Sequence, residues 1–196
     1  MSNKIKIPLF PLNLVLLPNE ELSLHIFENK YKNMVSDCIN NNTDFGIVLK
    51  KQTYQNTIGC TAKIVDVLYE YDSGEYDIVV KGNRRFNVLG TQIKNELLLG
   101  SATFIKESKK SIDQDLIKSV RNNYLNILLN HKLTKDFDIE TQRKTSYDFT
   151  KKIILPNKLK EYFLEQNNES ERLKFLNELF IKVIQESNHK KKYDYN

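Results

Sequence analysis

The chain has 196 residues, of which 40% are hydrophobic and 28% are charged, and its net charge is +5. This composition is typical of an ordinary globular protein, and a chain of this length can bury a core without disulfides or metals to hold it. No apolar run approaches the ~20 residues that cross a bilayer, so we expect a cytoplasmic protein without a membrane partner.

The two cysteines, Cys38 and Cys60, belong to no C-x-x-C pair, which argues against structural zinc. A disulfide between them is one alternative, but we expect two buried free thiols in a reducing compartment. The basic surplus lies in residues 109–196, with 18 basic and 13 acidic side chains, whereas residues 1–108 hold 12 of each. A surplus spread over helices and a tail is typical of a solvated surface rather than a nucleic-acid site.

The first stretch, residues 6–31, consists of short apolar bursts interrupted by Pro8, Pro11 and Pro18. Proline fixes φ and donates no hydrogen bond, so this stretch predicts strands rather than one long helix. Residues 29–40 follow as a helix with one apolar face. Further strands are expected at residues 45–49, 60–71, 75–81, 84–93 and 97–105, with a hairpin turn at Asp72-Ser73-Gly74 and bulges at Gly90 and Gly100.

All six glycines lie before residue 101, and their loss afterwards indicates a change of architecture. We therefore expect a β-rich part over residues 1–108, a helical bundle over residues 109–188 and a basic, disordered tail over residues 189–196. Helices are expected from a capping box at Ser111 and Gln114 to about His131, then at residues 146–155, 158–165 and 169–186, with a polar loop at residues 132–143.

No catalytic motif is present: the chain lacks a phosphate-binding G-x-x-x-x-G-K-[ST] loop, a G-x-S-x-G turn and an H-E-x-x-H pair. His25 and Cys38 could form a base–thiol pair, but no third orienting residue is visible. The favoured alternative is a histidine at a strand end, hydrogen-bonded to Glu28 or to a backbone carbonyl. We expect no catalytic residue, no metal and no cofactor.

Two groups of side chains are candidates for binding a partner. Arg84 and Arg85 adjoin Phe86, but neighbouring residues in a strand point to opposite faces, so we expect one solvated arginine and one paired with a carboxylate. Tyr69, Tyr71 and Tyr76 flank the hairpin turn. They either stabilise the hairpin across its strands or form an exposed aromatic strip for an extended polypeptide.

Several motifs resemble a known family. They contain Pro11, Leu12, Pro18, His25, Phe27 and Glu28 in the opening stretch, Gly82, Arg85 and Phe86 in a Gly-x-x-Arg-Phe strand, and the segments at residues 59–64 and 171–173. Together they resemble the substrate-binding N-terminal domain of Lon proteases over nearly the whole chain. The resemblance implies an α+β fold: a PUA-like β pseudo-barrel with one helix, followed by an α-helical bundle. It implies a structural role for these motif residues.

Full Lon proteases continue into ATPase and Ser-Lys peptidase domains, which are absent here, so we expect a stand-alone member that is not an enzyme. The resemblance implies a polypeptide-binding module for protein quality control. Its partners would be unfolded or misfolded polypeptide and a separate Lon-type protease. Binding would use a groove between the two parts, or strand addition at an exposed edge. The alternative is an RNA-binding protein, because PUA-like barrels elsewhere grip RNA and the isoelectric point is about 9.0.

Overall fold

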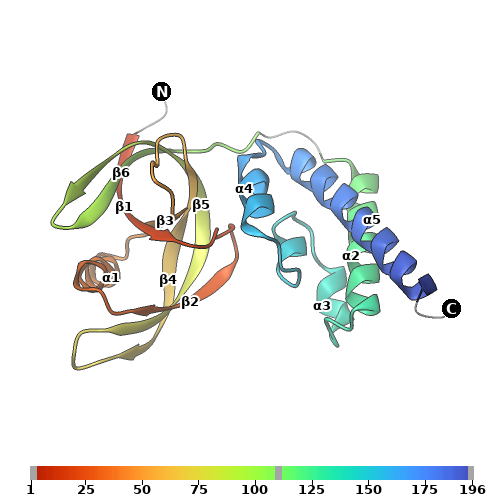
Figure 1. Ribbon diagram of the computed structural model, residues 1–196, viewed down its shortest axis with the longest axis horizontal. Helices are drawn as coiled ribbons and strands as arrows, with labels where there is room; N and C mark the ends of the chain where they lie inside the picture. Colours follow the sequence, from red (N-terminus) through yellow and green to blue (C-terminus); the bar gives the residue numbers. More distant parts are fainter. Residues whose placement is uncertain (1–3, 109–111, 194–196) are drawn as a thin grey trace. The chain divides into compact units, whose positions relative to one another are not determined.

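A computed structural model describes residues 4–108 and 112–193, with side chains described as far as residue 187, and shows a mixed α+β protein (Figure 1). It divides into two compact units, Met1–Lys106 with Pro156–Glu165, and Glu107–Leu155 with Gln166–Asn196. The expected α+β class, a β part followed by helices, is confirmed. The glycine pattern predicts one break after residue 108, whereas in the structure Pro156–Glu165 returns to the first unit.

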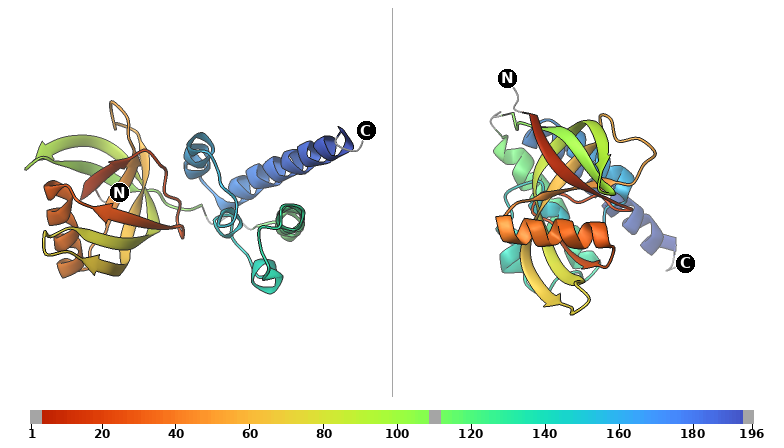
Figure 2. Two further views of the ribbon diagram at one scale, coloured as in Figure 1. Left: turned by 60° about the horizontal axis from the view of Figure 1, so that its bottom comes forward. Right: turned by 90° about the vertical axis from the view of Figure 1, so that its left-hand side faces the viewer.

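The first unit is a small barrel. Its elements are β1 (Lys4–Leu12), β2 (Glu21–Ile26), α1 (Asn29–Asn41), β3 (Phe45–Leu49), β4 (Ile58–Glu70), β5 (Tyr76–Lys94), β6 (Leu97–Phe104) and α4 (Asn157–Glu165). The strand order is β2-β5-β4-β3-β1-β6, and a further β5–β6 pairing closes the ring. Only the β1–β3 pair is parallel among the described strand pairs. Figure 2 shows the curled sheet from two further directions.

The prolines of β1 fit because this strand changes partner at Leu9. Residues 4–9 pair with β6, and residues 9–12 pair with β3. Pro8 and Pro11 therefore each have a strand on one side only, where a residue without an N–H is tolerated. Each of these prolines can therefore lack a ladder hydrogen bond on one side of the strand at most, and the opening stretch still pairs within the barrel.

Apolar faces meet in the barrel interior. Helix α1 buries Met34, Val35 and Cys38, the face that its spacing predicts, against strands β3, β4 and β5. A second group of buried side chains surrounds Phe86, which is fully buried. Glycines provide the room for this ring, because a Cβ on Gly46 or Gly59 would come within 2.7 or 2.6 Å of it.

Of the two predicted bulges, only the one at Gly90 is confirmed. The β5–β6 register shifts between Val88 and Gly90. The expectation for Gly100 is wrong, because the register is continuous there and the missing Cβ makes room for Leu9, whose Cδ1 would lie 2.9 Å away.

Helix α4 is anchored to the barrel by polar contacts. Asn157 accepts a hydrogen bond from the Val15 backbone at 3.1 Å and donates one to the Asn13 carbonyl at 2.9 Å. Lys160 pairs with Glu20, and the buried Arg85 donates to the Leu164 carbonyl at the end of the helix. In the sequence, α4 lies between two segments of the helical unit. These long-range bonds explain why it nevertheless belongs to the barrel unit.

The second unit is helical, with α2 (Gln114–Asn130), α3 (Phe137–Thr141), the 3-10 turn η1 (Asp148–Thr150) and α5 (Glu169–Tyr193). Ser111 lies outside the described residues, and α2 is capped instead by Asp113, whose carboxylate accepts from the Asp115 N–H at 2.9 Å. The Tyr124 ring of α2 packs edge to face against Phe149 and at a tilt against Phe180 in the core.

Three predictions about the helical part are wrong. Residues 146–155 form only η1, because the Asp148 carboxylate accepts bonds from the Thr145 backbone and hydroxyl and so favours a local turn. The loop predicted at residues 132–143 contains α3 and the buried Glu140. Helix α5 runs to Tyr193 rather than ending at residue 186, because no Gly or Pro interrupts it. Residues 194–196 of the predicted tail lie outside the described residues.

Candidate functional site

The β4–β5 hairpin forms as the sequence predicts. Its turn is made by Asp72, Ser73 and Gly74, and Gly74 has φ +77°, a conformation that glycine adopts without a steric cost. The Tyr71 carbonyl accepts a hydrogen bond from the Gly74 N–H at 2.8 Å, and the Tyr71 N–H donates one to the Glu75 carbonyl at 3.0 Å. In Figure 1 the hairpin extends from the barrel beside α1.

Large apolar side chains lie exposed along the outer half of this hairpin. In β4 these are Val65, Val67, Leu68 and Tyr69, of which Leu68 is 56% and Tyr69 57% exposed. The β4–β5 register shifts between Ile64 and Asp66 and again between Val67 and Tyr69. A bulge adds one residue and resets the alternation of faces. Val65 and Leu68 stand at these two shifts without a Cα partner in β5, and both side chains are exposed.

Aromatic rings continue this surface. The Tyr69 and Tyr71 rings meet edge to face with centroids 4.6 Å apart, and His25 lies against Tyr71 at 5.9 Å and stacks on Phe27 at 6.0 Å. Phe27 follows β2 and is 60% exposed. We call the exposed side chains of this region the hairpin surface: Phe27, Val65, Val67, Leu68, Tyr69 and Tyr71.

A carboxylate holds the rings in place. Tyr71 donates to Asp77 Oδ2 at 2.7 Å, and His25 Nδ1 donates to Asp77 Oδ1 at 2.8 Å. The Tyr71 hydrogen bond, and then the His25 bond, lower the pKa of Asp77, while the bond to Asp77 raises the pKa of Tyr71. The ionised carboxylate thus fixes two aromatic side chains in one arrangement, which reduces the entropy that binding must remove.

The sequence-predicted tyrosines do not all share this surface. Tyr76 is only 8% exposed, and its hydroxyl donates to Glu70 at 3.0 Å, so its ring belongs to the barrel core. The expected strip of three tyrosines is therefore reduced to Tyr69 and Tyr71. Phe27 and the valines and leucine of β4 take its place. The consecutive apolar residues from Val67 to Tyr69 were the available signal, because no regular strand can bury three neighbours on one face.

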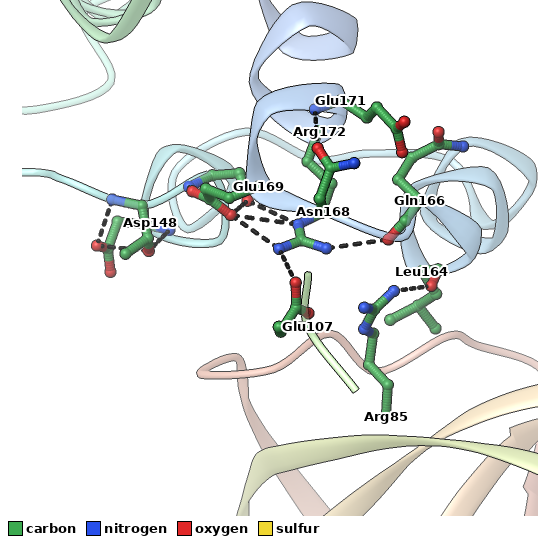
Figure 3. A network of polar contacts seen from close by, with 11 residues as sticks. Arg85, Glu107, Asp148, Leu164, Gln166, Asn168, Glu169, Glu171 and Arg172 are labelled. Atoms are coloured by element: carbon green, nitrogen blue, oxygen red, sulfur yellow. Dashed lines mark hydrogen bonds and ion pairs between the residues drawn. The ribbon is translucent and has the colours of Figure 1, made fainter. Parts of the chain in front are cut away.

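The two arginines point to opposite faces as expected. Arg84 is exposed, and its guanidinium lies 3.5 Å from the centre of the Phe104 ring, a cation–π contact. Arg85 is buried and donates a hydrogen bond to the Leu164 carbonyl (Figure 3). Arg84 lies on strand β5 just before the stretch that pairs with β6, which begins at Phe86, and away from the turn that carries the tyrosines.

Family-motif residues fall into an interior and a surface group. Pro18, Gly82, Arg85 and Phe86 are buried, and Pro11 and Leu12 are half-buried. His25, Phe27 and Glu28 are exposed.

Glu28 begins α1, where its carbonyl accepts from Tyr31 and Lys32, and its carboxylate pairs with Lys30 at 2.9 Å. His25 bonds Asp77 rather than Glu28.

Both cysteines are free and buried. Burial raises the pKa of Cys38, and it raises the pKa of Cys60 to about 12. A thiol nucleophile needs a lowered pKa, so Cys38 does not have the properties of the base–thiol pair considered above. Within the described part of the chain, His, Cys, Asp and Glu form no group that could hold a metal ion. None of the described helices is long and apolar enough to span a membrane.

A pocket of about 270 Å³ lies beside the hairpin surface, between the end of α1 and strand β4. Ile39, Asn42 and Thr43 line it from the helix side, and residues 63–67 line it from β4. Ile39 and Val67 are each 38% exposed. The pocket therefore continues the apolar surface into a recess.

A buried arginine of the helical unit has a structural role. Arg172 is 2% exposed and bonds Glu169, Glu107 and the Gln166 carbonyl at 2.9, 2.8 and 3.0 Å (Figure 3). Its guanidinium also lies 4.8 Å from the Tyr147 ring. An arginine whose donors are used in this way ties α5 to the preceding chain and offers little to a ligand.

Together these features define a two-unit α+β protein whose barrel carries an exposed apolar hairpin. A family model described as the ATP-dependent protease La (LON) substrate-binding domain matches residues 6–182. The chain belongs to this family, as its motifs indicate.

Two solved structures agree in fold. A Lon N-terminal domain protein from Xanthomonas campestris is 22% identical, with a TM-score of 0.67, and the match covers 88% of this chain and 96% of that one. The N-terminal domain of a Mycobacterium avium complex Lon protease is 16% identical, with a TM-score of 0.71, covering 90% of this chain and 98% of that one. No curated protein sequence matches the chain significantly.

Proposed function

We propose that the chain is a non-catalytic module that binds unfolded or misfolded polypeptide through the hairpin surface. The observation that carries this proposal is the row of exposed apolar side chains from Val65 to Tyr71, next to Phe27. Exposed apolar residues gathered on one strand mark an interaction site more often than residues scattered singly. Unfolded chains expose the same kind of side chain, so they are the matching partner.

The binding would be weak at each contact and additive along the hairpin. Tyr69, Tyr71 and Phe27 offer ring faces, and Leu68 and Val67 offer aliphatic surface between them. Such contacts depend on apolar area and not on one sequence, which suits a module that must accept many damaged chains.

The module would act as an adaptor in protein quality control, passing held polypeptide to a separate Lon-type protease in the cytoplasm. Support comes from the family, and from a neighbour of the same fold that is the N-terminal domain of a Lon protease. The two free cysteines fit a reducing compartment.

Fluorescence anisotropy with a reduced, alkylated and therefore permanently unfolded protein tests this function. Replacing Leu68 and Tyr69 together by serine removes two exposed side chains of the hairpin surface. We expect at least a roughly tenfold weaker affinity, because two central contacts commonly contribute about 1 kcal/mol or more each. Ile93→Ser is the matched control, because Ile93 is 76% exposed on the β5–β6 hairpin of the same unit.

Equal binding by the double variant and the native chain would contradict the proposal. The proposal would also be contradicted if the chain bound single-stranded RNA with a steep salt dependence and did not bind the unfolded protein. That second result would favour the RNA-binding alternative.

A further inference from the structure

The outer edge of β4 has no strand partner beyond its first residues. Strand β3 pairs with β4 only from Cys60 to Ala62. From Lys63 to Glu70, the one strand that pairs with β4 among the described residues is β5, on the opposite side. An edge of this kind presents backbone N–H and C=O groups to which another extended chain can add.

The recess beside this edge can hold a side chain of such an added strand. The 270 Å³ pocket lies along residues 63–67 of β4 and is closed on its other side by Ile39 and Thr43. Its volume is near the lower end of the range for ligand pockets, ~300 Å³. It therefore suits one or two apolar side chains rather than a folded surface.

The charges around the edge favour one kind of segment. Between Ile64 and Val80 the hairpin has no lysine or arginine, and it carries five acidic residues: Asp66, Glu70, Asp72, Glu75 and Asp77. The last turn of α1 has no basic residue and lines the pocket, so the negative end of its dipole adds to the negative charge there. Three cations lie in this region: Lys63 lines the pocket, Lys81 pairs across from Lys63 on β5, and Lys32 donates to the Ser73 carbonyl at 2.9 Å. The net charge around the edge is therefore negative.

We propose that the outer edge of β4 from Lys63 to Glu70 accepts an extended polypeptide segment as an added strand, and that it selects segments in which apolar residues alternate with lysine or arginine. One apolar side chain enters the pocket at the end of α1, and the basic side chains face the hairpin carboxylates. This inference rests on the proposed polypeptide-binding function, and it specifies which polypeptide segments the chain would bind.

Three fluorescein-labelled peptides of roughly the length of the edge test this inference by anisotropy with the full chain. The first alternates valine with lysine, the second alternates valine with glutamate, and the third is the first peptide with alternate backbone nitrogens methylated. We expect the valine–lysine peptide to bind about tenfold tighter than the valine–glutamate peptide, because exposed ion pairs each add up to a few-fold in affinity. The methylated peptide should lose binding, because it cannot complete a strand ladder.

A charge-reversal variant shows whether the selection belongs to this edge. Within the described residues the side chains of Asp66 and Asp72 make no hydrogen bond or ion pair, and Asp66 pairs with Val79 in the β4–β5 ladder. The double substitution Asp66→Lys, Asp72→Lys therefore leaves the side-chain contacts of the hairpin intact. It should invert the preference between the two peptides. The matched control, Glu165→Lys with Glu178→Lys, changes the net charge equally at exposed helical positions and should keep the preference.

The possible results separate this inference from the proposed function. One result is that the Leu68→Ser, Tyr69→Ser variant no longer binds unfolded protein, while the native chain binds the three peptides with equal affinity. The proposed function then stands and the edge inference is wrong. If the control variant loses the valine–lysine peptide as strongly as the Asp66→Lys, Asp72→Lys variant, the attraction is that of any acidic surface and the inference is also wrong. If neither unfolded protein nor any peptide binds, both fail together.

Discussion

Gly82 offers the sharpest test of how the barrel is held together. A Cβ at this position would lie 2.1 Å from the Leu17 carbonyl oxygen and 2.9 Å from its carbon, both backbone atoms that cannot rotate away. The same segment is joined to Gly82 by two backbone hydrogen bonds, from Asn19 N–H to the Gly82 carbonyl at 2.8 Å and from Gly82 N–H to the Glu20 carbonyl at 2.9 Å. Gly82→Ala therefore forces the Leu17–Glu20 segment away from β5.

The magnitude follows from these contacts. Overpacking costs about 1–3 kcal/mol, and weakening two hydrogen bonds adds about 1 kcal/mol each. We expect the free energy of unfolding of the barrel unit to fall by about 3–5 kcal/mol. Gly90→Ala is the matched control in the same strand, since nothing lies within 4 Å of a Cβ there. It should change stability by less than about 1 kcal/mol.

The assay is urea unfolding followed by circular dichroism, because the chain has no tryptophan. Labelling of the buried thiol of Cys60 gives a second readout, since its sulfur lies 3.3 Å from the Cβ position of Gly82. If Gly82→Ala were no more destabilising than Gly90→Ala, the close approach of Leu17 would not hold the strand, and the reasoning would be refuted.

Two further predictions concern titrating groups. Burial, together with the hydrogen bond to Glu140 at 2.6 Å, raises the pKa of Tyr124. The stability that this provides is complete below the unfolded pKa of about 10, and it is lost as the pH rises further, by about 1.4 kcal/mol per pH unit. Alkaline titration at the tyrosinate absorbance should show one tyrosine ionising only as the helices melt, a step that Tyr124→Phe removes. Separately, because burial raises the pKa of Cys60 to about 12, its alkylation at pH 9 should remain as slow as unfolding, and fast labelling of the native chain would contradict the burial.

Some features of this protein were decided locally and could be predicted from the sequence. The helical period of residues 29–40 predicts the buried face of α1, because helical spacing alone decides which side chains share a face. Asp72-Ser73-Gly74 predicts the hairpin turn, because glycine alone adopts its φ easily. The Gly82-x-x-Arg85-Phe86 motif predicts the family, which the match over residues 6–182 confirms.

Other features depended on contacts between residues far apart in the sequence. The polar contacts of Asn157, Lys160 and Leu164 bring α4 to the barrel, and nothing in the helical pattern of residues 157–165 shows which unit that helix joins. The predicted helix at residues 146–155 failed because side-chain bonds from Thr145 to Asp148 stabilise a turn instead.

The sequence by itself therefore determined the kinds of element, the change of architecture after the last glycine and the family. Only the tertiary structure decided which apolar residues are exposed. Tyr76 and Tyr69 look alike in the sequence, but Tyr69 pairs across from Asp77 and is 57% exposed, while Tyr76 is 8% exposed and packs into the core. Strand register is set by pairing with a partner strand, and pairing is a property of the folded sheet rather than of the segment.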